Sequence, residues 1–240
     1  KSPFKKDKPL PVNVIRDISL PVEVENVKIK DGLIVYAERH GKSRREGTLF
    51  LNNVNATVSN IKNSNLTIAD SLKLDFKADL MDAAQISLAL EESYLDTLSG
   101  FLLKAQVGSV NLDFLNSVLV PFANVKIASG NLDSISFKAI GRQDLAFGEM
   151  QMHYNKLRIK LVKDGDPEVS TFLQNVISVL ANAFVIKRSN SKRKGLMYFE
   201  HLPKQSFVNY IIKTTFSGIA SSVGVASNRK YIKKYNRALK

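Results

Sequence analysis

The stretch LKLDFKADL, Leu72–Leu80, alternates apolar and polar residues without a break. Because successive side chains of a β-strand point to opposite faces, this order gives one apolar face and one polar face. The same alternation indicates half-buried strands elsewhere in the chain. It recurs in VEVENVKIKDGLIVYAE (22–38), GTLFLNNVNATVSNI (47–61), QISLALEE (85–92), FLLKAQVGSV (101–110), NVKIASGNLDSISFKAIG (124–141) and GEMQMHYNKLRIKL (148–161).

Short segments rich in Gly, Asn and Asp separate these strands and predict turns. They are KDG (30–32), RHGKSRREG (39–47), NSN (63–65), SG (129–130), GRQD (141–144) and KDGDP (163–167). One interruption, NLDFLNSVLVPFA (111–123), predicts a short helix or turn that closes near Pro121. Since no helical crossover of useful length intervenes, the sequence predicts an antiparallel meander of about eight strands.

After Asp164 the apolar residues no longer occur at every second position. Three-to-four spacing of apolar residues in VSTFLQNVISVLANAFVI (169–186) predicts an amphipathic helix. GLMYFEHLP (195–203) predicts a strand, and SFVNYIIKTTFSGIASSVGV (206–225) predicts a helix that loosens at Gly218 and Gly224. The end, NRKYIKKYNRALK (228–240), is a basic tail that we expect to be helical only when bound.

Together these segments predict a mainly β (α+β) fold. We expect a large curved antiparallel β-sheet meander with an apolar concave face, capped by C-terminal helices. The expected division is an extended linker at residues 1–19, the sheet domain at 20–163, a helical cap with a short strand at 164–226, and the basic tail at 227–240.

The width of such a sheet bears on function. Eight strands spaced by about 4.8 Å span roughly 40 Å, whereas a helix is about 10 Å wide. One or two helices therefore cannot cover the apolar face. Either the sheet folds on itself as a sandwich or barrel, or it leaves an apolar trough that an apolar ligand such as lipid would occupy.

Charge is concentrated at the C-terminal end. Residues 186–240 contain 13 Lys and Arg and one acid, Glu200, while the other 185 residues contain 22 basic and 21 acidic side chains. This asymmetry indicates an anionic partner, either a membrane surface or a nucleic acid, or else a solvated basic tail that only aids solubility. The candidate residues for binding an anionic surface are Lys187, Arg188, Lys192, Arg193, Lys194, Arg229, Lys230, Lys233, Lys234 and Arg237.

No motif indicates catalysis or a cofactor. The chain has no Cys, which excludes disulfides, zinc–thiolate sites and Cys nucleophiles. It has three His, in no zinc-binding or triad spacing, and no phosphate-binding loop. Met150, Met152 and His153 can each ligate copper, but strand alternation sends His153 to the face opposite the two methionines. We therefore predict a non-enzymatic protein with no metal and no cofactor.

The order of short motifs resembles the AsmA-like family of bacterial envelope proteins, especially its C-terminal region. Three elements carry the resemblance: a short helical element, the opening of one strand, and a following strand. The matching residues are Leu115, Asn116, Leu119 and Pro121; then Gly130, Leu132 and Asp133; then Gly148, Met150, Tyr154, Leu157, Ile159 and Leu161. The similarity covers about Val22 to Val162 and carries no catalytic residues.

The resemblance implies a β-rich envelope protein with bridge-like lipid-transfer architecture. It implies phospholipid or another acyl lipid as ligand, a role in outer-membrane and envelope biogenesis, envelope protein partners, and a periplasmic location. The resemblance also implies an inner-membrane anchor. Since the start KSPFKKDKPLP has no apolar signal region, we expect that anchor in a segment missing from this chain. The basic C-terminus departs from the family pattern.

Candidate lipid-facing residues lie on the predicted apolar strand faces: Leu72, Leu74, Phe76, Leu88, Leu90, Ile135, Phe137, Met150, Met152 and Tyr154. The same residues can instead form the core of a sandwich. A second hypothesis is a structural β-rich scaffold that docks to an anionic membrane through its basic end. Nucleic-acid binding by that end ranks third, because the β-region shows no face that combines basic and aromatic residues.

Overall fold

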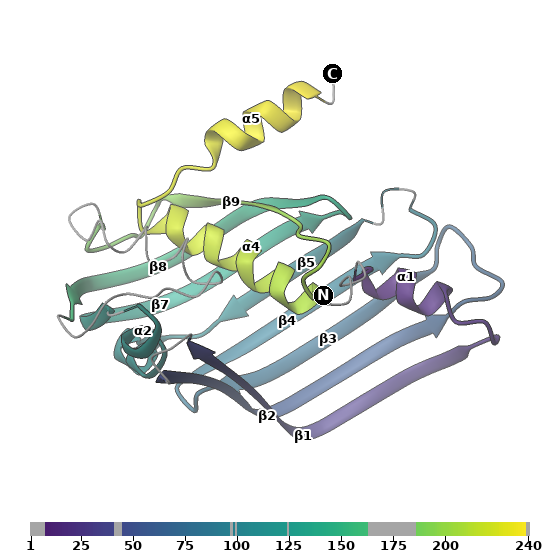
Figure 1. Ribbon diagram of the computed structural model, residues 1–240, viewed down its shortest axis with the longest axis horizontal. Helices are drawn as coiled ribbons and strands as arrows, with labels where there is room; N and C mark the ends of the chain where they lie inside the picture. The colour runs from purple at the N-terminus through teal and green to yellow at the C-terminus, as the bar shows by residue number, and fades with distance from the viewer. Residues whose placement is uncertain are drawn as a thin grey trace, which may run out of the picture.

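One antiparallel sheet of nine strands dominates the protein, which confirms the predicted mainly β fold (Figure 1). The computed structural model describes residues 8–40, 45–96, 98, 100–123, 125–162 and 186–238. Strands follow one another across the sheet in the order β1-β2-β3-β4-β5-β7-β8-β9, with the two-residue β6 paired to β7. The strands are β1 Glu23–His40, β2 Arg45–Lys62, β3 Ser71–Leu80, β4 Ala84–Ser93, β5 Phe101–Val107, β6 Val110–Asn111, β7 Val125–Gly141, β8 Leu145–Leu161 and β9 Lys194–Glu200.

Two segments expected as turns lie inside long strands. β1 continues through Lys30–Gly32, and β7 continues through Ser129–Gly130. At both places the pairing register shifts, and Asp31 has a positive φ of 51°. Gly and Asp favour β-bulges as well as turns, because both residues tolerate left-handed backbone angles. The chain therefore bends at these positions without reversing.

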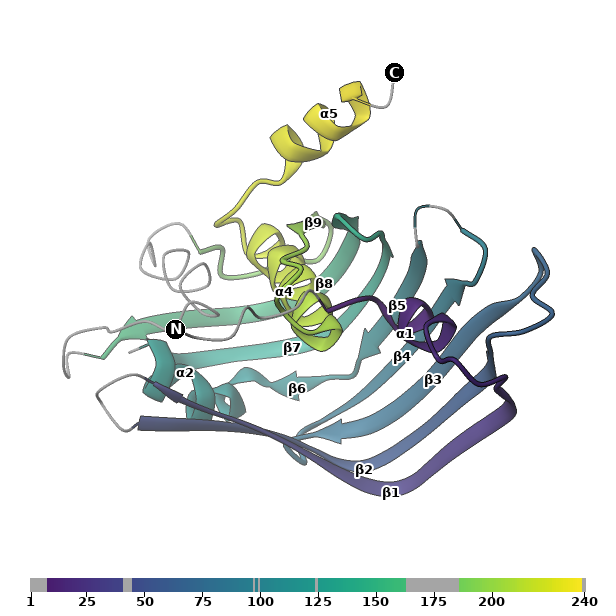
Figure 2. The ribbon, with the colours of Figure 1, turned by 45° about the vertical axis from the view of Figure 1, so that its right-hand side comes forward.

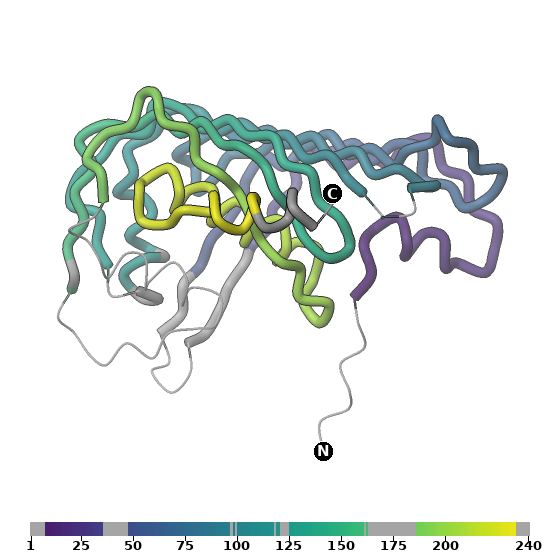
Figure 3. The backbone as a smooth tube through the Cα atoms, turned by 90° about the horizontal axis from the view of Figure 1, so that it is seen from above, coloured from purple at the N-terminus to yellow at the C-terminus, as the bar shows by residue number. Residues whose placement is uncertain are grey.

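The helices are α1 Pro11–Arg16, the 3₁₀ turn η1 Leu112–Leu115, α2 Asn116–Ala123, α4 Phe207–Ser222 and α5 Arg229–Ala238. Figure 3 shows α1, α2 and α4 on the same side of the sheet. α4 packs on β8 and β9, whereas α2 contacts both β7 and β2. α5 extends away from the sheet beyond the β9 edge (Figures 1 and 2).

Several helical predictions need correction. α2 ends at Ala123, close to Pro121 as predicted, whereas α4 continues through Gly218 instead of loosening there. The chain leaves α4 before Gly224, which has a φ of 88°. Residues Arg229–Ala238 of the basic tail form α5. Part of the expected N-terminal linker is helical in α1. The amphipathic helix predicted around residues 169–186 lies almost entirely outside the described residues.

Apolar side chains between the sheet and the helices form two clusters of buried residues. The larger extends from β4 to β9 and includes Tyr210 of α4. The smaller joins Val12 of α1 to Leu72 of β3 and Tyr94, which follows β4. The helices thus cover opposite parts of one sheet face, and the opposite face carries most of the charged residues of the strands.

Candidate functional site: the apolar face of the sheet

Two rows of apolar residues and glycines cross the whole sheet on the face that carries the helices. Within each row, every residue lies directly opposite the next on the neighbouring strand, so the side chains share a face. The first row is Val27, Val58, Leu74, Leu90, Leu103, Ala139, Gly148 and Met197. The second is Ile29, Ala56, Phe76, Leu88, Ala105, Phe137, Met150 and Gly195.

All ten candidate lipid-facing residues belong to this face. Seven of them are buried by the described elements: Leu72, Leu90, Ile135, Phe137, Met150, Met152 and Tyr154. The other three, Leu74, Phe76 and Leu88, are half-buried. Seven candidates therefore serve as core, and the three that stay partly open lie in the middle of β3 and β4. Val27 and Ile29, the β1 members of the two rows, are 44% and 49% exposed.

Close backbone approach explains why α4 buries the β8–β9 end of the face. A Cβ atom added to Gly195 would lie 2.6 Å from the carbonyl oxygen of Gly218 and 3.0 Å from the backbone nitrogen of Ser222. A Cβ on Gly218 would in turn lie 3.0 Å from the terminal methyl of Met150. Paired glycines let the helix lie directly on the strand, and the flexible methionine fills the remaining space.

A polar network closes the region beside Tyr154. The Asn190 side-chain amide donates to the carbonyls of Met152 (2.8 Å) and Arg193 (2.9 Å), and its oxygen accepts from Arg193 N (2.9 Å). The Tyr154 hydroxyl donates to the Lys187 carbonyl (2.8 Å). These buried groups are all paired, which fixes residues 187–193 against β8.

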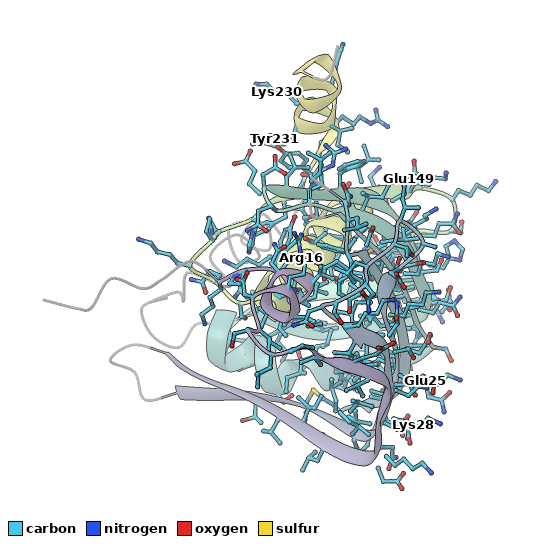
Figure 4. All side chains as sticks on the ribbon, turned by 90° about the vertical axis from the view of Figure 1, so that its right-hand side faces the viewer. Arg16, Glu25, Lys28, Glu149, Lys230 and Tyr231 are labelled. Atoms are coloured by element: carbon cyan, nitrogen blue, oxygen red, sulfur yellow. The ribbon has the colours of Figure 1, made fainter. Side chains whose placement is uncertain are left out.

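The segment Lys8–Arg16, which contains α1, crosses the other end of the face as a strap. Its N-terminal end is held by Lys8 N, which donates to the Pro203 carbonyl (2.6 Å). Leu10 and Val12 are buried against the sheet. At the far end, the Arg16 guanidinium donates to the Tyr94 carbonyl (3.4 Å), and Figure 4 shows Arg16 on the helix side of the sheet. The strap therefore joins the β9–α4 corner to β4.

A carboxyl group lies beneath this strap. Glu92 is fully buried, and its Oε2 accepts from Val12 N (3.2 Å), while Oε1 has no partner among the described residues. Burial raises the pKa of Glu92 to about 7, opposed in part by the Val12 hydrogen bond. The sequence carries a signal for this burial, because Glu92 has the same strand parity as Leu88 and Leu90 and so points to the apolar face.

Most of the basic candidates are exposed, in two groups. Lys187, Arg188 and Lys192 lie in the loop before β9, and Arg229, Lys230 and Lys233 lie on α5. Figure 4 shows Lys230 far from the sheet. Two candidates have structural partners: Lys194 pairs with Glu149 (2.8 Å), and Arg193 contacts Tyr154. Lys234 and Arg237 belong to α5, but their side chains lie outside the description.

Two shallow hollows of about 520 and 670 Å³ lie against the middle strands. Their linings take consecutive residues from each strand, such as Asp75, Phe76 and Lys77. Residues of both faces therefore contribute, and neither hollow is a closed apolar cavity. The open apolar face is a surface rather than a pre-formed pocket.

Within the described residues, no group of three or more His, Cys, Asp or Glu side chains could hold a metal ion. Met150 and Met152 are buried, whereas Gln151 is exposed and His153 is half-buried across the sheet. His201, which we did not single out as a site, is buried; its Nδ1 lies 2.8 Å from the Gln143 carbonyl and its ring stacks on Tyr210.

No family model, curated protein or solved structure matches the chain. The AsmA-like resemblance thus rests on the sequence motifs alone. None of the helices that the structure describes combines the length and apolar character needed to cross a bilayer.

Proposed function

We propose that this protein binds acyl chains of lipids along the apolar face of its sheet, as a non-enzymatic envelope protein of AsmA-like type. The observation that carries the proposal is the continuity of the two apolar rows across all the long strands, with Leu74, Phe76 and Leu88 half-buried at their centre. Exposed apolar surface of this kind is costly in water and is relieved by an apolar ligand.

A concave face is part of this proposal, and the contacts of α2 support it. β2 and β7 are separated by three strands, so a flat sheet would place them about 19 Å apart. A helix is only about 10 Å wide, yet α2 contacts both strands. Bending of the sheet around α2 accounts for both contacts, and a bent sheet can surround a chain-like ligand.

The proposed cellular setting follows from the resemblance. We propose an inner-membrane-anchored, periplasmic protein that contributes to outer-membrane and envelope biogenesis by conducting phospholipid. The expected partners are acyl lipid, an anionic membrane surface and other envelope proteins.

Phe76→Glu tests lipid binding on the open part of the face. A carboxylate among acyl chains lacks a partner, so its desolvation should lower lipid occupancy at least about tenfold. Native mass spectrometry of gently purified protein, incubated with phospholipid vesicles, measures that occupancy. The matched control is Lys77→Glu, which adds the same side chain one residue away on the polar face. A wild-type protein that never carries phospholipid contradicts the proposal, as does equal loss in both variants.

The alternative function, a scaffold docked to an anionic surface, is favoured by the exposure of α5. Lys230, Lys233 and Lys234 changed together to Glu should weaken binding to phosphatidylserine-containing vesicles by at least about a hundredfold, since each lysine contributes about 1 kcal/mol near such a surface. Co-sedimentation with the vesicles measures the effect.

The control for α5 is the same charge reversal at Lys28, Lys77 and Lys104, which are exposed and lie on β1, β3 and β5. Equal weakening of vesicle binding in both triple variants would mean that binding depends on the net charge of the protein and not on α5. A preference for RNA or DNA over anionic vesicles, with steep salt dependence, would instead support the nucleic-acid hypothesis.

A further inference from the structure

The two edge strands of the sheet, β9 and β1, differ in whether their outer backbone groups have hydrogen-bond partners. Side chains satisfy the outer backbone groups of β9: Ser221 Oγ accepts from Leu196 N (2.9 Å), Ser217 Oγ accepts from Tyr198 N (3.0 Å), and Asn228 donates to Leu196 O (2.6 Å). β1 forms the other edge and, among the described strands, pairs with β2 alone. A covered edge cannot add a strand, whereas an uncovered edge can.

The open edge is unprotected in one short segment. Before Asp31, four charged residues of β1 interrupt the apolar ones: Glu23, Glu25, Lys28 and Lys30. Figure 4 shows Glu25 and Lys28 at the margin of the sheet. Charges on an edge strand oppose pairing with another chain. The pairing of β1 with β2 is irregular between Ile29 and Gly32 and again between Gly32 and Ile34. Between Asp31 and position 38 there is no charged residue.

Leu33, Ile34 and Val35 occupy this unprotected segment and are 64%, 46% and 56% exposed. Three consecutive exposed apolar residues on a strand are unfavourable for a monomer unless they serve an interface. No described residue outside β2 hydrogen-bonds to the backbone of these three. The segment therefore presents both unpaired backbone groups and apolar side chains.

The geometry points to a second copy of this chain as the partner. We propose a two-fold dimer in which β1 pairs antiparallel with β1 of the other copy, with Ile34 on the axis. Such an interface requires each residue to face its reciprocal partner. This register places Ile34 opposite Ile34 of the second copy and Leu33 opposite its Val35, so the three exposed residues of the segment all meet aliphatic side chains.

The orientation of the copies follows from strand geometry. Directly opposite residues of an antiparallel pair point to the same face, so the two-fold axis is perpendicular to the sheet. The apolar faces of both copies consequently lie on the same side of one continuous sheet. The dimer rests on the edge geometry and does not depend on the proposed lipid binding. Its short interface makes it a reversible dimer.

Cross-linking tests the axis directly, because the chain has no Cys of its own. Directly opposite Cα atoms lie about 4.5–5.5 Å apart, which fits a disulfide. Ile34→Cys should therefore give a disulfide-linked dimer under mild oxidation. Val24→Cys is the matched control: Val24 is 38% exposed on the same strand but ten residues from the axis. Cross-linking of both variants to the same extent would overturn the proposal.

Sedimentation equilibrium supplies the second measurement. The wild-type mass should rise with concentration from 26.7 kDa towards twice that value. Ile34→Lys places two like charges opposite each other and should weaken the dimer at least about tenfold. Because Ile34 is exposed, we expect the thermal unfolding of the single chain to change little. A wild-type mass that stays monomeric, a dimer insensitive to Ile34→Lys, or a mass that climbs past the dimer would each overturn the two-fold pair.

Discussion

Glu92→Gln should make the protein more stable than the wild type by about 3 kcal/mol above neutral pH. The folded-state pKa of Glu92 is about 7, against an ordinary value of 4.5, so the folded state holds a proton that the unfolded state releases between these values. Wild-type stability from this group is therefore present at low pH and is lost as the pH rises from about 4.5 through about 7. Glutamine keeps an oxygen for Val12 N and does not titrate.

Urea unfolding of both proteins at about pH 4.5 and about pH 8.5 measures the difference, because other titrating groups cancel between them. Glu91→Gln is the control: Glu91 is adjacent but exposed, and its ion pair with Lys73 is long at 3.9 Å. The difference in the free energy of unfolding between Glu92→Gln and wild type should increase with pH. The difference between Glu91→Gln and wild type should not. Equal pH dependence in wild type and Glu92→Gln would refute an uncompensated carboxylate beneath α1.

Gly195→Ala should lower the free energy of unfolding by about 2–3 kcal/mol. The added methyl meets the Gly218 carbonyl oxygen and backbone atoms of Ser222, which cannot move without lifting α4 from β9. Overpacking against backbone is more costly than overpacking against a flexible side chain. Thermal or denaturant unfolding measures the loss.

Gly108→Ala is the comparison for this variant. Its Cβ would lie 3.7 Å from the nearest neighbour, the Gln85 carbonyl oxygen, which is an ordinary contact. Replacing glycine at a compatible position reduces the entropy of the unfolded chain, so this variant should be neutral or slightly stabilised. If both variants unfold alike, the close approach of α4 to β9 is not what makes Gly195 necessary.

The strands could be predicted from the sequence because alternation is a local signal. LKLDFKADL forms β3 with the expected apolar face, and GLMYFE forms most of β9. The bulges could not be distinguished from turns, since KDG suits both backbone conformations. What decides between them is the partner strand: Asn53 of β2 has a positive φ of 50° near the irregularity of β1.

How much of the apolar face stays exposed was harder to predict, because it depends on which helices pack on the face in the folded protein. The six residues of α1 are too few to show helical periodicity, yet they bury Leu72 and Glu92. Gly218 allows the close contact between α4 and the sheet, although the sequence predicts that the helix loosens there. Only packing shows that Gly218 instead brings the helix onto β9.

The contacts of α2 have a consequence for how the chain folds. Each long strand pairs with its predecessor along the chain, apart from the insertion of β6 and α2 before β7. Short loops are inexpensive to close, so the sheet can form by adding one strand at a time. The contact of α2 with β2 instead joins Asn116–Ala123 to a strand that ends at Lys62. That contact must wait until the intervening strands have formed, which makes α2 a reporter of complete assembly.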